Sequence, residues 1–243
     1  MTPRIRAVLA VALFALVLGG VSVYTLVTDE ITERVLSTDE GSEFESPPLE
    51  AAGGGTYAYM STQPDTDDVP VTYDPCETIR IEVNDERAPR DADEILEEAL
   101  AQMEDLTGLA FDVVGTTDAE PLADGDIRDG DTYRPVQLSW SDADTVPELA
   151  GDVAGLGGST WIEDDGYRWY VTGDVVLDAD DLERFGREVT MMVLLHELGH
   201  LVGLAHVDST AELMHPSSGG PDWGPGDLVG LEQLGGGRCG VPG

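Results

Sequence analysis

Basic side chains are scarce in this sequence, and lysine is absent from it. Twelve arginines stand against 49 aspartates and glutamates, which gives the 243-residue chain a formal net charge of −37. A protein that binds nucleic acid presents a basic face to the phosphates, and electrostatic binding to anionic lipid needs a basic patch. The composition therefore predicts no nucleic-acid partner, and it argues against a polybasic contact with a membrane surface.

Cysteine and histidine are also rare. Two cysteines, Cys76 and Cys239, are too few for a small domain held together by several disulfides or for a zinc site made of cysteines alone. All four histidines lie between residues 196 and 215. Hydrophobic residues make up 41% of the sequence, so the chain as a whole is not disordered. We expect one domain of ordinary size with tails.

Residues 1–28 contain a long uncharged run. Residues 7–27 carry no charge, follow Arg4 and Arg6, and precede Asp29. A helix of this length spans about 31 Å, close to the hydrocarbon thickness of a bilayer, and the flanking charges place its N-terminus in the cytoplasm. We predict a single-pass transmembrane anchor with the remaining chain outside the cell. The alternative is a cleaved signal peptide, which would secrete the remainder.

Residues 29–74 have the composition of a flexible acidic stalk. Twelve acidic residues are opposed by Arg34 alone, and a Gly-Gly-Gly run at 53–55 interrupts the segment. Few large apolar side chains are available to form a core, and like charges repel along the chain. We therefore expect this segment to hold a folded domain, residues 75–243, away from the membrane.

The folded part mixes strands and helices without strict alternation. Alternating or continuous apolar patterns predict strands at 78–84, 110–114, 136–140, 161–162 and 169–177. Apolar residues at helical spacing predict a helix that begins after Asp91 and ends near Gly108. An almost wholly apolar helix is expected over 188–202 and a last helix over 227–234. These elements predict the α+β class.

The apolar helix carries a cluster of reactive side chains. Residues 196–206 read HELGHLVGLAH. Because residues four apart share a helix face, His196 and His200 can present ring nitrogens to a single ion about 2.1 Å away. Gly203 can adopt a left-handed conformation and end the helix, which would let the chain turn back and bring His206 to the same ion.

Three neutral imidazoles leave a tetrahedral Zn²⁺ with one open position, which is the arrangement of a catalytic zinc. Glu197 stands beside the first histidine, where it can take a proton from water in that position. A buried carboxylate or imidazole without a partner is costly, so these residues need a ligand. We predict one catalytic zinc ion bound by His196, His200 and His206, with Glu197 as general base.

This pattern resembles the metzincin signature, in which a turn containing methionine follows the third histidine. Met214, eight residues after His206, looks like that turn, and its spacing with Pro216 is similar to the matrixin branch, the matrix-metalloproteinase-like M10 peptidases. Weaker similarities lie at 107–109, 173–178 and 227–234. The resemblance implies a zincin-like catalytic domain, in which an active-site helix separates an upper subdomain with a twisted sheet from a smaller lower subdomain.

The resemblance also implies a role for Met214, as the floor beneath the metal. Two departures stand out: Val207 replaces the usual serine, and His215 stands where tyrosine is common. We interpret His215 as a packing residue rather than a fourth ligand. No histidine precedes His196, so the second, structural zinc of matrixins has no evident ligands here.

Calcium is a second candidate metal. The acidic cluster of Asp174, Asp178, Asp180 and Asp181 could hold Ca²⁺ through oxygen ligands. Solvated surface carboxylates are the simpler interpretation, and both stay open.

The two cysteines have two interpretations. A disulfide between Cys76 and Cys239 would join the ends of the folded domain, which an oxidising compartment permits, and would stabilise it by about 4–5 kcal/mol in the chain-entropy model. Alternatively, the RCGVP sequence at 238–242 resembles the matrixin cysteine switch, in which a thiolate occupies the open position of the zinc. In that family the motif precedes the catalytic domain, whereas here it follows.

Together these features predict an exported zinc endopeptidase that acts on proteins or peptides. A membrane-tethered binding module, in which the metal only stabilises the fold, is the alternative. The presence of Glu197 favours the enzyme, because a purely structural zinc needs no general base.

Overall fold

The computed structural model describes residues 12–15, 45–123, 126–217 and 222–242. Its main sheet has six strands in the spatial order β1-β9-β10-β8-β4-β5. Strands β4, β5, β8 and β10 run parallel, whereas β9 is antiparallel to β10, and β1 is antiparallel to β9. The bounds of these strands are β1 Ala12–Ala15, β4 Thr78–Asn84, β5 Ala110–Thr116, β8 Val136–Ser141, β9 Val153–Asp164 and β10 Tyr167–Asp178.

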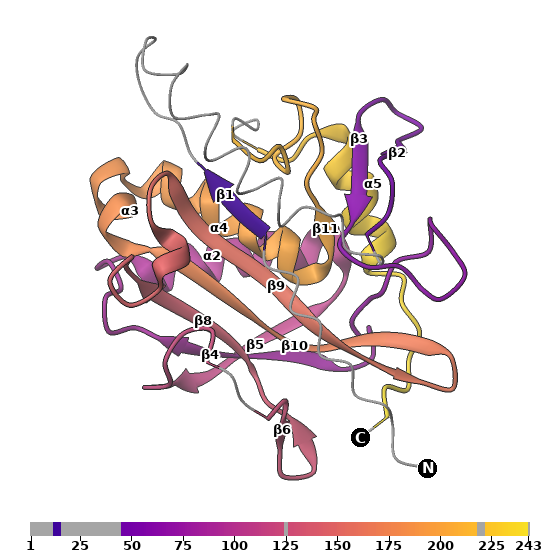
Figure 1. Ribbon diagram of the computed structural model, residues 1–243, viewed down its shortest axis with the longest axis horizontal. Coiled ribbons are helices and arrows are strands. Elements are labelled where there is room, and N and C mark those ends of the chain that lie inside the picture. Colours follow the sequence, from indigo (N-terminus) through magenta and orange to yellow (C-terminus); the bar gives the residue numbers. More distant parts are fainter. Residues whose placement is uncertain (1–11, 16–44, 124–125, 218–221, 243) are drawn as a thin grey trace.

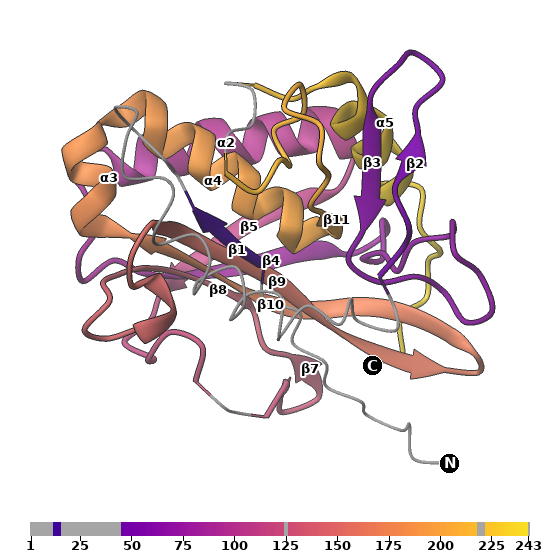
Figure 2. The same ribbon diagram turned by 45° about the horizontal axis from the view of Figure 1, so that its top comes forward.

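Helices cover one face of this twisted sheet (Figures 1 and 2). The two long helices are α2 (Ala92–Thr107) and α4 (Arg187–Val202), and α3 (Ala179–Phe185) links β10 to α4. Helix α5 (Pro225–Leu234) packs beside a small three-stranded sheet in the order β11-β3-β2. The remaining elements are β2 Leu49–Glu50, β3 Thr56–Tyr59, β11 Leu204–Ala205, the hairpin β6 Arg128–Asp129 and β7 Thr132–Tyr133, and the 3-10 turn Pro147–Leu149.

The core lies between the sheet and helices α2 and α4. In β4, Ile79, Ile81 and Val83 point inward and are buried, as the alternating pattern predicts. Helix α2 buries one apolar stripe against this layer and ends at Gly108, whose φ of 74° is left-handed. Helix α4 is buried over most of its length because it is apolar on nearly every face. Burial of each large apolar side chain stabilises the fold by about 1.5–3 kcal/mol.

The mixed architecture confirms the predicted α+β class, and most predicted elements lie within a few residues of their expected bounds. Strand β9 is longer than expected, because it continues through the glycine-rich stretch 155–158. Asp91 occupies the N-cap of α2, but its side chain makes no capping hydrogen bond and instead pairs with Arg187. Strands β2 and β3 and helix α3 were not predicted.

The transmembrane helix predicted over residues 7–27 is not supported. Most of that segment lies outside the described residues, and its described part, Ala12–Ala15, is a strand that pairs with β9. Among the residues that the structure describes, no helix combines the length and the apolar character needed to cross a bilayer. The prediction was open to this error because a uniformly apolar run is compatible with either a helix or a strand. Hydrophobic periodicity does not distinguish the two in such a run.

The flexible stalk predicted over residues 29–74 needs a correction as well. Residues 29–44 lie outside the described part, but residues 45–74 contain β2 and β3 and pack on the domain. Tyr57, Tyr59 and Val71 are buried in the main core. Strand β3, which carries the two tyrosines, packs on β11 and α5, far along the chain, and a count of local composition does not detect such contacts. Residue 75 is therefore not the start of the packed structure.

A disulfide joins Cys76 to Cys239 and fixes the C-terminal tail. The carboxylate of Asp74 accepts hydrogen bonds from the backbone N–H groups of Gly240 and Val241, at 2.6 and 2.9 Å. The tail runs beside the end of the β9–β10 hairpin that carries its turn (Figure 1). There the indole N–H of Trp169 donates a hydrogen bond to the carbonyl of Arg238. Cys239 is held away from the histidines, so the arrangement expected of a cysteine switch is not present.

Candidate metal centre and active site

The C-terminal half of α4 and the turn after it bring three histidines together. His196 and His200 lie one helical turn apart and both are fully buried. Gly203 ends the helix with a φ of 124°, and β11 then leads back to His206. The three Nε2 atoms lie 3.1 Å from one another in every pair. The three predicted metal ligands therefore converge on one point.

The opposite ring nitrogen of two of these histidines is fixed by a backbone carbonyl. Nδ1 of His196 lies 2.8 Å from the oxygen of Leu213, and Nδ1 of His200 lies 2.7 Å from the oxygen of Leu204. A carbonyl can only accept, so each Nδ1 carries the proton and each Nε2 presents a lone pair. This is the second contact that metal-binding histidines usually make.

Burial keeps the three imidazoles neutral. It lowers the pKa of His200 to about 4 and the pKa of His196 and His206 well below the ordinary value. The lone pairs of His196 and His200 that face each other at 3.1 Å have no proton to share, which is unfavourable unless a cation lies between them. Zn–N bonds of about 2.0–2.1 Å are compatible with this spacing, so the residues present fit a zinc ion.

Glu197 lies beside this cluster and is fully buried. Neither carboxylate oxygen has a hydrogen-bond partner within the described part of the chain, and burial raises the pKa of the side chain well above its usual range. The strand β9 lies close above it, since a Cβ on Gly155 would stand 2.8 Å from Cγ of Glu197. An uncompensated buried carboxylate is costly, and a nearby cation would favour its charged form.

The predicted methionine turn lies under the helix. Met214 is buried, and its sulfur would lie 2.8 Å from a Cβ placed on Gly199, next to His200. The N–H of Val207 donates to the carbonyl of Met214 at 3.1 Å, which ties the turn to the residue after His206. His215 is only half-buried and is not part of the group of residues that could hold a metal with the other three histidines.

The acidic residues predicted as a candidate calcium site are not brought together as a metal-holding group in the described structure. Asp174 pairs with Arg134, and Asp180 pairs with Arg87. Asp178 accepts the N–H of Asp181 at the start of α3. Each of these carboxylates therefore has a partner of its own, which is the behaviour of structural and surface acids.

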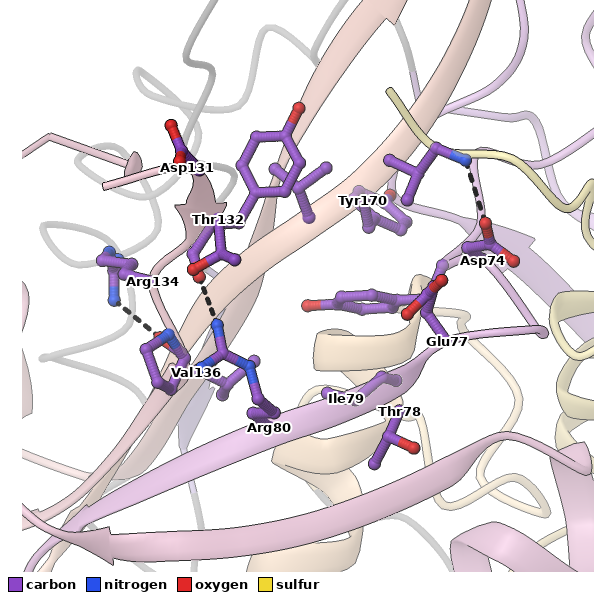
Figure 3. A pocket seen from close by; sticks show the side chains of 15 residues that line it. Asp74, Glu77, Thr78, Ile79, Arg80, Asp131, Thr132, Arg134, Val136 and Tyr170 are labelled. Atoms are coloured by element: carbon purple, nitrogen blue, oxygen red, sulfur yellow. Dashed lines mark hydrogen bonds between the residues drawn. The ribbon is translucent and has the colours of Figure 1, made fainter. Parts of the chain in front are cut away.

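A cavity of about 280 Å³ lies elsewhere, at the start of strands β4, β8 and β10 (Figure 3). It is lined in part by Tyr73, Arg80 and Tyr170, and it contains none of the three histidines. Its arginines are occupied: Arg80 donates to the carbonyl of Tyr133 and Arg134 pairs with Asp174. We therefore locate the candidate active site at the histidines and not at this cavity.

Two buried acids near the histidines were missed in the sequence. The carboxylate of Glu212 accepts from the N–H groups of Gly226 and Asp227 at 2.8 and 3.1 Å. Asp227 accepts from the N–H groups of Leu213 and Gly224 at 2.5 and 3.0 Å. Gly226, directly before Asp227, was an available signal for that acid, because a glycine lets a backbone approach closely, whereas no glycine adjoins Glu212 in the sequence.

Comparisons with known proteins agree with this geometry. The family model of the matrixins, peptidase family M10, matches residues 77–222. A protein of Trichoplusia ni ascovirus 2c, named "Putative matrix metalloproteinase", is 32% identical over 75 residues. That similarity covers 26% of this chain and 15% of the viral protein.

Proposed function

The chain belongs to the matrixin family, and from this premise we propose that it is an exported zinc-dependent endopeptidase with Glu197 as its general base. The proposal rests on one observation above all: three imidazole nitrogens converge within 3.1 Å of one another beside a buried carboxylate without a hydrogen-bond partner. Membership of a peptidase family makes proteins or peptides the expected substrates.

The residues divide the chemistry between them. His196, His200 and His206 would hold the zinc ion, which when bound supplies Lewis-acid polarisation of the scissile carbonyl and acidifies a coordinated water. The carbonyls of Leu213 and Leu204 keep the two helical imidazoles in the tautomer that offers Nε2. Glu197 takes the proton of the attacking water on a carboxylate oxygen and delivers it to the nitrogen of the departing amine.

The raised pKa of Glu197 suits this task. A carboxylate with an ordinary pKa is a poor base at neutral pH, whereas a base whose pKa lies closer to the working pH both accepts and returns a proton readily. Burial supplies the upward shift, and a cation at the histidines would moderate it.

A binding module with a purely structural metal is disfavoured by the same carboxylate. In such a module a buried acid without a hydrogen-bond partner would only destabilise the fold. Replacing Glu197 with an uncharged residue would remove the free-energy cost of its desolvation. A buried carboxylate with no hydrogen-bond partner among the described residues, next to the histidines, is what a catalytic role requires.

Export is proposed on the basis of the disulfide between Cys76 and Cys239, because disulfides persist mainly in oxidising compartments. Recovery of the native protein from the cytosol alone, with both thiols open to alkylation, would contradict it.

The decisive experiment combines metal analysis with a peptide-cleavage assay. We expect one zinc ion per chain, loss of cleavage after removal of zinc with a chelator, and recovery when zinc is returned. The Glu197→Ala variant should keep its zinc and lose nearly all turnover. Undiminished proteolysis by purified Glu197→Ala protein would overturn the assignment of the base, and a wild-type protein that binds no zinc would overturn the function.

A further inference from the structure

A strand from outside the family-matched region contacts the turn that joins two of the histidines. Strand β3 lies upstream of residue 77, where that match begins. It pairs antiparallel with β11, with Tyr59 opposite Leu204 and Ala58 opposite Ala205. The N–H of Met60 extends the contact by donating to the carbonyl of Gly203 at 2.9 Å.

This pairing falls on the residues that orient the metal ligands. Leu204 is the residue whose carbonyl fixes Nδ1 of His200, and Ala205 directly precedes His206. Strand β3 thus supports the backbone between the second and third histidines from outside. The helical hydrogen bonds of α4 stop at its C-cap, Gly203, so they do not extend over this stretch of backbone.

The start of β3 is attached to the methionine turn through Glu212. One carboxylate oxygen accepts the N–H of Thr56 at 3.3 Å, and the other accepts from Gly226 and Asp227 at the start of α5. Glu212 also directly precedes Leu213, whose carbonyl fixes Nδ1 of His196. One buried side chain therefore joins three segments that meet behind the histidines.

Glycines around Glu212 leave space for its carboxylate. A Cβ on Gly55 or on Gly224 would collide with its oxygens, and a Cβ on Gly226 would collide with the backbone of Thr56. The side chain has no exposed surface, and the hydrogen bonds that it receives come from backbone N–H groups. A buried carboxylate is stable only when such bonds compensate for its loss of water.

We propose that Glu212 is a positioning residue for the metal centre and that, with Thr56–Tyr59, it forms a brace that holds the carbonyls of Leu204 and Leu213 against their histidines. The segment upstream of the family-matched region then contributes to the geometry of the metal centre. This inference rests on the proposed zinc-dependent function. Loss of contacts behind metal-binding histidines typically costs 10–100-fold in metal affinity or activity.

The test is the zinc affinity of the full chain, measured by competition with a chelating dye. In Glu212→Gln the amide NH₂ replaces one acceptor oxygen, so the three backbone donors can no longer all be satisfied. We expect zinc to bind at least tenfold more weakly. Glu232→Gln, which changes an exposed glutamate of α5, is the matched control and should stay within twofold of wild type.

A second variant covers the case in which Glu212→Gln does not fold. Thr56→Pro removes one donor to Glu212 at the first residue of β3, a position where a strand tolerates proline. It should also weaken zinc binding, whereas circular dichroism of the zinc-free protein stays unchanged.

The outcomes separate the two claims. Zinc affinity within twofold of wild type in both folded variants would overturn the brace and leave the endopeptidase intact. Failure of the wild-type chain to bind zinc would overturn the proposed function itself.

Discussion

Two buried glutamates flank the histidine cluster, and their surroundings are opposite. Glu197, under strand β9, has no hydrogen bond to either oxygen among the described residues. Glu212, where β3, the methionine turn and α5 meet, receives hydrogen bonds from three backbone N–H groups. Both side chains are fully buried, so burial alone does not distinguish them.

The difference matches the roles proposed for the two acids, with Glu197 as the reacting group and Glu212 as the supporting group. A buried carboxylate with its hydrogen bonds satisfied is compensated for its loss of water and can contribute to stability. A carboxylate left without partners destabilises the fold until a cation or substrate compensates for it, and such strained groups concentrate at active sites.

The largest expected effect comes from making Glu197 neutral. Glu197→Gln should lower kcat/KM by about 10³-fold, within the usual range for loss of a general base. At pH 7 the zinc-free variant should be at least as resistant to urea as wild type, because an uncompensated buried acid has been removed. Activity and unfolding measured on the same preparations would test the contrast. If Glu197→Gln instead loses as much stability as Glu212→Gln, the two glutamates stabilise the fold in the same way and the contrast between them is wrong.

The pH dependence of stability should reveal a third buried acid, Asp227. Burial raises its pKa to about 6 from an ordinary value near 4, so the folded state binds a proton that the unfolded state has released between these pH values. Its contribution to stability is therefore fully present below pH 4 and declines as the pH rises to 6, by about 3 kcal/mol.

Urea unfolding of wild type and Asp227→Asn at several pH values would measure this contribution. The asparagine variant should gain stability relative to wild type as the pH rises from 4 to 7. A difference between the two proteins that does not change with pH would contradict the expectation.

A smaller effect is expected where β9 approaches Glu197. A Cβ on Gly155 would stand 2.8 Å from Cγ and 2.9 Å from Oε1 of that side chain, so Gly155→Ala should displace the carboxylate. Displacement of a catalytic group lowers the rate even when binding persists, and we expect kcat to fall about tenfold with zinc retained. Gly53→Ala, which meets no atom within 4 Å, is the control and should leave kcat unchanged.

The features that were predicted correctly from the sequence are those that depend on residues close together along the chain. Helix α4, its end at Gly203 and the convergence of His196 and His200 follow from helical spacing and from the conformational freedom of glycine. The alternation in β4 likewise fixed the bounds of that strand to the residue.

Two of the features that were missed, strand β3 and the buried Glu212, depend on partners far along the chain. Strand β3 is short, lies in an acidic segment, and pairs on one side with the two-residue strand β2 and on the other with β11, about 150 residues later. Glu212 cannot be identified as buried from its neighbours in the sequence, because the donors that stabilise it belong to β3 and α5. No local pattern contains that information.

The link between Cys76 and Cys239 has a consequence for the lifetime of the molecule. A single backbone cut anywhere between these residues leaves both products covalently attached, so neither fragment can diffuse away. A chain cut once by a protease would therefore persist as a single nicked molecule, and its two fragments would separate only after reduction of the disulfide.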